Sequence, residues 1–218
     1  MNAVCFDLDD TLYPYADYAR SGLRNAADEL AGLTGRHLRA ELFELYFDRG
    51  VSEGTFDRLL ADHDLPAALS EPMVEAYHDA VGPLEPYDDT EAVLAELGES
   101  YALGLVTDGH NGEAKLSELG LDGYFDAVVV NPPLGITKRE REPFDRVTSQ
   151  LAIDHDEMVY VGDDPRCDFA VPNVLGAGTV RLRRGRYTDH SPASNDAVPD
   201  AEIERLAELP GVFDSNGW

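Results

Sequence analysis

Apolar residues form short continuous runs near the N-terminus and again from position 102 onward, and turn or acidic residues follow each run. Runs of this length that end at turn residues predict strands buried on both faces of a sheet. An additional, weaker run near the end of the chain predicts an edge strand. The predicted strands are Ala3–Phe6, Ala102–Val106, Ala127–Val130, Met158–Val161 and Thr179–Leu182, with the edge strand at Ala201–Ile203.

Segments with helical spacing lie between these strands. Asp89–Leu97, the stretch from Asn111 to Leu119, and Glu142–Leu151 each place their apolar residues on one face. Strands that alternate with helices along a chain favour a parallel sheet with helices on both of its faces. The sequence therefore predicts the α/β class, with a Rossmann-like parallel-sheet core.

The stretch from Pro14 to about Glu85 interrupts this alternation. It holds no convincing strand, and its apolar residues recur at helical spacing between Gly35, Gly50 and Pro66. We expect an inserted α-helical cap at 14–85 and a catalytic core formed by 1–13 and 86–218. The apolar positions are Leu23, Ala26, Ala27 and Leu30, then Leu38, Leu42, Leu45 and Tyr46, then Phe56, Leu59 and Leu60, and finally Met73, Ala76, Tyr77 and Ala80.

The C-terminal region is the least regular part of the pattern. A short helix is expected to end at Leu209, and Asp214–Trp218 are expected to fray.

The chain is strongly acidic, with a formal net charge of −26, and its acidic residues are spread along its whole length. Such a field repels nucleic acid and anionic lipid, so neither is an expected partner. An ordinary acidic enzyme would fit this composition, but we favour a halophilic protein, in which salt screens the self-repulsion. No run of about 18 apolar residues and no basic leader pattern is present, which predicts a cytoplasmic protein without membrane helices.

Acidic residues, together with Thr107, lie where the predicted strands end. Because the carboxyl ends of parallel strands meet at one edge of the sheet, these side chains should converge there. Converging carboxylates must bind a cation or carry raised pKa values, and an all-oxygen donor set suits Mg²⁺. The residues are Asp7, Asp9 and Asp10 after the first strand, Thr107 and Asp108 after the second, and Asp163, Asp164 and Asp168 after the fourth.

Asp7 and Asp9 lie two residues apart at the end of the first strand. If the strand breaks into a loop between them, both carboxylates can face one reaction centre. One could then attack phosphorus while the other handles the proton of the leaving group. An aspartate-rich turn is the structural alternative, and the acidic partners at another strand end favour the catalytic interpretation.

Four segments resemble the motifs of the haloacid dehalogenase-like hydrolase superfamily, in order and spacing, over roughly residues 3–185. The helical insertion resembles the cap of its subfamily I, in which an α-helical cap follows the first strand. The segments are Phe6-Asp-Leu-Asp-Asp-Thr-Leu12, Thr107-Asp108-Gly109, Lys138, and Val161-Gly-Asp-Asp-Pro-Arg-Cys-Asp168.

The resemblance implies a role for each matching residue. Asp7 would be the nucleophile that forms an aspartyl-phosphate, and Asp9 the general acid and base. Lys138 would neutralise nucleophile and phosphate together. Thr107 and the backbone N–H of Asp108 would hold the phosphoryl oxygens, with Gly109 as a further substrate-binding residue. The metal, Mg²⁺, would be held by Asp7, the backbone carbonyl of Asp9, Asp163 and Asp168, the last either as a ligand or as a neighbour of one.

Two departures from the family pattern leave questions open. The second motif commonly has Asn where this chain has Asp108, which puts an extra negative charge beside the phosphate unless that side chain faces away. The third-motif lysine is usually followed by proline, whereas Arg139 follows Lys138 here, so Arg139 or Arg141 could fill the role. Whether Asp164 or Asp168 is the further metal residue also stays open.

The superfamily hosts several chemistries, so the reaction must be argued from residues. Asp9 argues against dehalogenation, and the absence of lysine from 14–85 argues against a Schiff base of the phosphonate-cleaving kind. We expect a phosphatase acting on a small phosphorylated metabolite, working as a monomer or homodimer. A sugar phosphomutase is the alternative, followed by a non-catalytic protein that binds a phosphometabolite.

Overall fold

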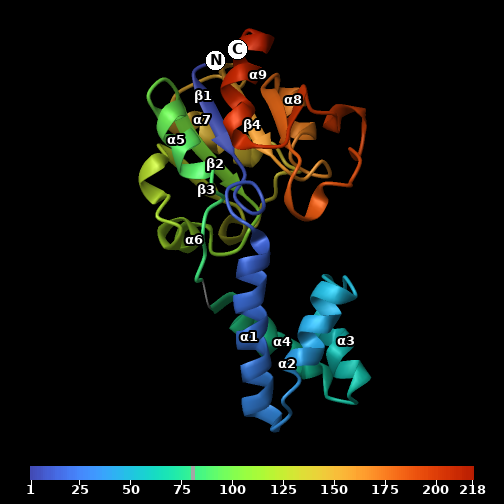
Figure 1. Ribbon diagram of the computed structural model, residues 1–218. Coiled ribbons are helices and arrows are strands. Elements are labelled where there is room, and N and C mark those ends of the chain that lie inside the picture. The colour runs from blue at the N-terminus through green and yellow to red at the C-terminus, as the bar shows by residue number, and fades with distance from the viewer. Residues whose placement is uncertain (80–81) are drawn as a thin grey trace. The chain divides into compact units, whose positions relative to one another are not determined.

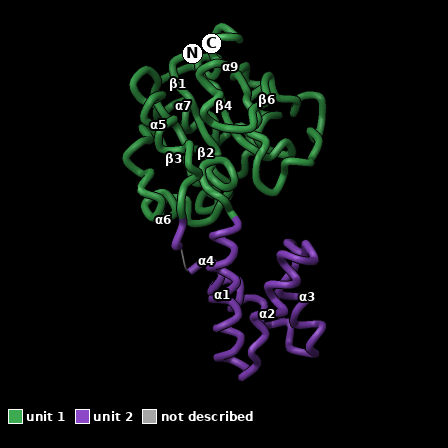
Figure 2. Tube along the Cα trace, in the orientation of Figure 1, with its two compact units in different colours: residues 1–15, 85–218 green, residues 16–84 purple. Residues whose placement is uncertain are grey.

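The computed structural model describes residues 1–79 and 82–218, and these form two compact units (Figure 2). The first contains residues 1–15 and 85–218, and the second contains residues 16–84. Ala80, which helical spacing assigns to the inserted bundle, lies outside the described residues. Within the described part of the chain, no helix is both long enough and apolar enough to cross a membrane.

The first unit is built on a sheet of parallel strands in the order β3-β2-β1-β4-β5-β6 (Figure 1). This arrangement confirms the α/β, Rossmann-like prediction. The central strand β1 pairs Phe6 with Leu105 of β2 on one side and with Val161 of β4 on the other. The strands are β1 Ala3–Phe6, β2 Ala102–Thr107, β3 Ala127–Val130, β4 Met158–Gly162, β5 Gly178–Leu182 and β6 Ala201–Ile203.

Apolar side chains cover both faces of this sheet. On one face Cys5, Val106 and Tyr160 pack with Phe144 and Val147 of helix α7. Because successive residues of a strand point to opposite faces, Leu103 and Leu105 turn to the other face, where they are fully buried. The helices of this unit are α5 Thr90–Gly98, α6 Gly112–Glu118, α7 Glu142–Leu151, α8 Ala170–Leu175 and α9 Leu209–Asn216.

The second unit is helical, and its described residues include no strand. Helix α1 approaches α4 closely, since a Cβ at Gly22 would lie 2.5 Å from the ring of Tyr77. Tyr18 of α1 also meets that ring edge-on, with ring centroids 5.7 Å apart. The helices are α1 Tyr15–Thr34, α2 Arg39–Phe43, which runs into a π-helical turn at Glu44–Asp48, α3 Thr55–Asp62 and α4 Ser70–Asp79.

The C-terminal segment corrects one expectation. Asp214–Trp218 do not fray, because α9 extends to Asn216 and the backbone N–H of Trp218 donates to the carbonyl of Phe213 at 3.2 Å. The Trp218 ring lies against Gly178, where a Cβ would come within 2.9 Å of it. A tertiary contact with β5 therefore orders a tail that local sequence marks as loose.

Candidate active site

The strand order brings the acidic segments together at one edge of the sheet. Asp7 follows β1, Asp108 follows β2 and Asp163 follows β4, and these three strands are neighbours. Since all strands run in the same direction, the side chains that follow them meet at the crevice beside the central strand. The site described below is made entirely of residues of the first unit.

The loop after β1 is tight and turns its aspartates in different directions. The N–H of Leu12 donates to the carbonyl of Leu8 at 2.9 Å, and the N–H of Asp10 donates to the carbonyl of Tyr13 at 3.0 Å. Asp10 has a positive φ of 63°, a conformation that aspartate tolerates better than most residues. This local fold separates the carboxylate of Asp7 from that of Asp9.

Asp7 lies in a buried cluster with Asp163, Asp168 and Lys138. The ammonium of Lys138 is 2.7 Å from Oδ1 of Asp7 and 2.6 Å from Oδ1 of Asp168. Thr11 adds a weak hydroxyl contact at 3.5 Å to Asp7 and donates at 3.3 Å to Asp163. One ammonium among three carboxylates leaves excess negative charge among buried side chains, so a further cation or a proton is needed.

The pKa values reflect this crowding. Burial raises the pKa of Asp7 to about 7, Lys138 opposes the rise, and the charges of Asp168 and Asp9 add to it. Burial and then the neighbouring charge of Asp7 raise the pKa of Asp163 well above its ordinary value. Burial lowers the pKa of Lys138, but Asp168 and Asp7 outweigh it and hold that pKa well above the usual range.

The same cluster fits a divalent cation. Asp7, Asp163 and Asp168 each offer a carboxylate oxygen, and these oxygens lie within 4.8 Å of one another. Oδ2 of Asp163 is buried and has no hydrogen-bond partner among the described residues, which is the condition of a ligand oxygen. Asp168 is more fully engaged, because its other oxygen accepts the N–H of Asp164 at 2.8 Å. Hard carboxylate oxygens of this kind suit Mg²⁺.

Asp9 lies apart from this cluster and makes different contacts. Lys115 donates to both of its oxygens, at 2.8 and 3.0 Å, and the hydroxyl of Tyr13 donates to Oδ1 at 2.6 Å. Burial alone would raise the pKa of Asp9, but the charge and hydrogen bonds of Lys115 and the hydrogen bond of Tyr13 bring it below its ordinary value. The described hydrogen bonds of the Asp9 side chain thus come from the ammonium of Lys115 and the hydroxyl of Tyr13.

The contacts of Asp108 explain how the chain accommodates an aspartate where the family commonly has asparagine. Its carboxylate accepts the backbone N–H of Lys138 at 3.0 Å and the side-chain amide of Asn131 at 2.6 Å. The extra negative charge therefore holds the segment that carries Lys138. The backbone N–H of Gly109 donates to the hydroxyl of Thr107 at 2.9 Å, and this hydroxyl can still donate its own hydrogen.

The segment after β5 braces the loop that follows β1. Arg186 pairs with Asp10 at 2.5 Å, and Arg184 donates to the carbonyl of Thr11 and pairs with Asp89 at 2.9 Å. A Cβ at Gly185 would clash with the side chain of Asp10. These contacts fix the conformation of the loop between Asp7 and Tyr13 from outside.

The sequence of residues 1–171 matches the family model described as haloacid dehalogenase-like hydrolase. The chain belongs to this family. The match covers most of the protein, from the first strand through the segment after β4 where Asp163 and Asp168 lie, and it confirms the predicted superfamily and the prediction of a hydrolase. The assignment to subfamily I and the role of the helical unit as a cap stay predictions.

Several relatives of this hydrolase are phosphatases by name, and a 2-haloacid dehalogenase from Pseudomonas syringae pv. Tomato shares its fold at 25% identity, with a TM-score of 0.70 over 99% of both chains. A glyceraldehyde 3-phosphate phosphatase of Methanopyrus kandleri is 37% identical over 97% of both chains. A ribulose-1,5-bisphosphate 5-phosphatase of Halopiger xanaduensis is 30% identical over 95% of this chain and 97% of its own. Among solved structures, a HAD phosphatase from Thermococcus onnurineus is 27% identical, with a TM-score of 0.68 over 98% of both chains.

The structure decides between residues that the sequence leaves open. Lys138 reaches Asp7, whereas Arg139 is exposed and Arg141 pairs with Asp145 on the surface at 3.0 Å. Asp168 joins the cluster around Lys138, whereas Asp164 turns to Arg166 at 2.8 Å.

The sequence patterns do not point to Lys115 or to the part that Asn131 plays beside Asp108. The scarcity of lysine, with only two in the chain, is the one signal that could have drawn attention to Lys115.

Proposed function

We propose that this hydrolase is a Mg²⁺-dependent phosphatase that cleaves a small phosphate monoester through an aspartyl-phosphate on Asp7. The observation that carries the proposal is the Asp7 carboxylate, held by the buried ammonium of Lys138. Beside it lies Asp163, whose second oxygen has no hydrogen-bond partner in the part of the chain that the structure describes. An attacking carboxylate, a fixed cation and an open ligand oxygen are what in-line phosphoryl transfer requires at one point.

In the first step an oxygen of Asp7 attacks phosphorus, and the bond between phosphorus and the ester oxygen breaks. Because Lys115 keeps the pKa of Asp9 low, Asp9 must take up a proton as the ester binds. It then gives that proton to the leaving oxygen, so the alcohol departs neutral. Lys138 stays in contact with Asp7 and balances the charge that accumulates on the transferred group. The Thr107 hydroxyl and the backbone N–H of Asp108 would hold the phosphoryl oxygens, and Gly109, whose own N–H donates to Thr107, would lie beside them.

In the second step water attacks the phosphorus of the aspartyl-phosphate. Asp9, now a carboxylate, takes the proton of that water, and the Asp7 carboxylate is released together with inorganic phosphate. Mg²⁺, held by Asp7, Asp163, the Asp9 backbone carbonyl and Asp168 directly or indirectly, would supply positive charge to the phosphoryl oxygens. Positioning and charge neutralisation then provide most of the catalysis.

The substrate is a small phosphorylated metabolite in this proposal. The named relatives support this class, since their substrates include glyceraldehyde 3-phosphate and ribulose 1,5-bisphosphate. A phosphomutase remains the alternative within phosphoryl transfer. Stimulation by a sugar bisphosphate primer, with little release of inorganic phosphate, would favour it.

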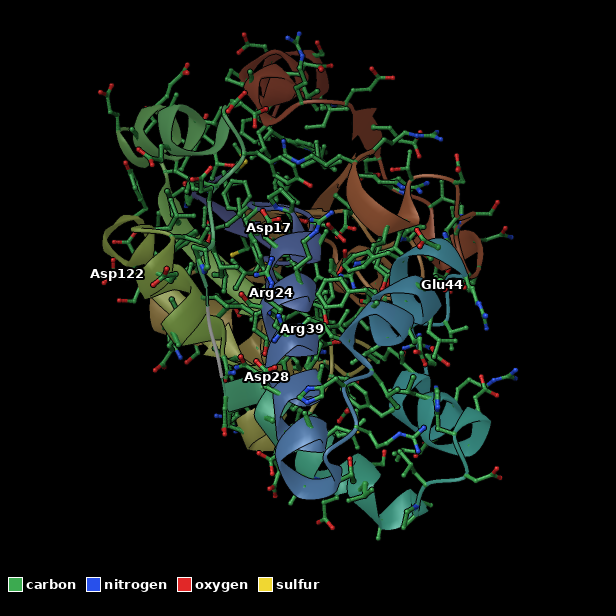
Figure 3. All side chains as sticks on the ribbon, turned by 60° about the horizontal axis from the view of Figure 1, so that its bottom comes forward. Asp17, Arg24, Asp28, Arg39, Glu44 and Asp122 are labelled. Carbon is green, nitrogen blue, oxygen red and sulfur yellow. The ribbon has the colours of Figure 1, made fainter. Side chains whose placement is uncertain are left out.

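The test is hydrolysis of p-nitrophenyl phosphate in molar KCl, with Mg²⁺ and with EDTA, by the wild type and by Asp7→Asn. We expect turnover that needs Mg²⁺ and that Asp7→Asn abolishes while its melting curve stays cooperative. Asp122→Asn, an exposed aspartate of the same unit (Figure 3), is the matched control and should retain wild-type activity. Turnover by Asp7→Asn equal to that of the wild type would refute the proposal.

A further inference from the structure

Lys115 is a buried cation that the steps above do not use. It lies on α6, its side chain is 0% exposed, and its ammonium is 2.8 and 3.0 Å from the two oxygens of Asp9. Placing an ammonium in such a site is unfavourable unless its charge is matched by a partner. The contact with Asp9 provides this partner, and it links α6 to the loop after β1.

The surroundings of Lys115 leave its ammonium little freedom. Its Nζ lies 5.8 Å from the ring centroid of Tyr13 and 5.5 Å from that of Tyr15, within the range of cation–π attraction. A Cβ at Gly109 would lie 3.1 Å from the same atom and would clash with Oδ2 of Asp9. Lys115 and Lys138 are the two lysines of the chain, and arginine takes every other Lys or Arg position. At position 115 the compact ammonium fits a space that has no room for a guanidinium.

The carboxylate of Asp9 is consequently fixed from three sides. Lys115 holds both oxygens, Tyr13 donates to Oδ1 at 2.6 Å, and Gly109 closes the space beside Oδ2. A proton moves efficiently only when donor and acceptor are held within hydrogen-bond reach and correctly oriented. The orientation of Asp9 is therefore set by Lys115, by Tyr13 and by the backbone of Gly109.

We propose that Lys115 is a positioning residue for proton transfer, holding the Asp9 carboxylate in the orientation from which it serves the leaving oxygen. This role rests on the proposed phosphatase function. Asp9 takes up a proton as the ester binds and gives it to the leaving oxygen as the bond to phosphorus breaks, while Lys115 holds the carboxylate in place. Because the Lys115 side chain is fully buried, it acts through Asp9 and does not touch the substrate.

The role has a consequence that a purely structural role lacks. p-Nitrophenolate is a stable anion and leaves with little help, whereas phenol is as weak an acid as a tyrosine side chain and needs a proton as it leaves. Disturbing the orientation of Asp9 should therefore slow phenyl phosphate far more than p-nitrophenyl phosphate. The two esters share the phosphate and the phenyl ring and differ only in the nitro group, so a loss of binding to the shared parts should affect both equally.

The experiment measures kcat/KM for both esters in Lys115→Met, Asp9→Asn and the double variant, after melting curves confirm folding. Lys115→Met should lose at least about tenfold more activity on phenyl phosphate than on p-nitrophenyl phosphate, as part of the 10²–10⁴-fold that general acid catalysis typically contributes. Asp9→Asn should show the same selectivity. Adding Lys115→Met to Asp9→Asn should not increase it, because the two changes act on one contact.

Tyr13→Phe keeps the test decisive if Lys115→Met does not fold. It removes one hydrogen bond to Asp9 without removing a charge, and it should produce the same selectivity to a smaller extent. Equal losses on both esters in the folded variants would overturn the positioning role while leaving the phosphatase intact. Persistent turnover in Asp7→Asn would instead overturn the proposed function itself.

Discussion

Charged side chains are placed differently in the two compact units. In the helical unit they pair at the surface, as Arg39 does with Asp28 (Figure 3), where the two side chains remain 54% and 64% exposed. The sheet unit also has surface pairs, such as Arg141 with Asp145, but its ion pair between Lys138 and Asp168 leaves those side chains only 4% and 0% exposed. The same residue chemistry thus occupies opposite environments in one chain.

The physical consequences of the two arrangements differ. An exposed pair gains only about 0.2–1 kcal/mol, because water and salt screen it and ordering long side chains has an entropic cost. A buried pair must overcome the desolvation of both charges, so replacing it by apolar residues is often neutral or stabilising. Buried charge is therefore expected where a reaction needs it, and here it concentrates at the carboxyl ends of β1, β2 and β4.

The strongest test of this contrast removes the cation of the buried cluster. Lys138→Met should lower kcat/KM by at least about 10²–10³-fold, the typical loss on removing one charge-stabilising donor. The melting temperature should change as well, since Asp7 and Asp168 are left without their shared ammonium. Activity on p-nitrophenyl phosphate and a thermal melt measure the two effects. Unchanged activity would remove Lys138 from the proposed mechanism.

The next test compares two glycines with similar backbone conformations. Gly185 of the sheet unit has φ +74°, and Gly35 of the helical unit has φ +72°. A Cβ at Gly35 meets nothing within 4 Å, whereas one at Gly185 clashes with Asp10. Gly35→Ala should cost about 1 kcal/mol from backbone strain, and Gly185→Ala about 1–3 kcal/mol more from overpacking. Denaturant unfolding measures both, and equal losses would contradict the bracing role of Gly185.

A smaller effect is expected from salt. At a net charge of −26 the folded chain repels itself, and molar KCl shortens the Debye length to about 3 Å. The melting temperature should rise by several degrees between low salt and molar KCl. A melting temperature that does not change over this range would argue against the halophilic interpretation.

The smallest effect is expected at the surface pair of the helical unit. Arg39→Ala, Asp28→Ala and their double variant should give a coupling free energy below about 1 kcal/mol, decreasing further in salt. A double-mutant cycle from urea unfolding measures this value. A coupling of several kcal/mol would show that exposure is a poor guide to ion-pair strength in this protein.

Sequence pattern was sufficient for the elements that local rules govern. The runs Ala3–Phe6 and Ala127–Val130 form β1 and β3 with the predicted bounds, and Glu142–Leu151 forms α7. Buried parallel strands are continuous apolar runs, and amphipathic helices repeat every three to four residues, so both leave a clear local signal. The order of the C-terminal segment left no such signal. It depends on the contact of the Trp218 ring with Gly178, which lies far away in the sequence.

The sequence by itself determined which carboxylates follow which strands. Because the carboxyl ends of parallel strands meet at one edge of the sheet, it also predicted that Asp7, Asp108 and Asp163 lie near one another. Only the tertiary structure decided which cation meets which carboxylate. Lys138 and Lys115 lie 131 and 106 residues from Asp7 and Asp9, and no local rule pairs side chains across such distances. Ion pairing depends on distance and burial in three dimensions, which the fold alone provides.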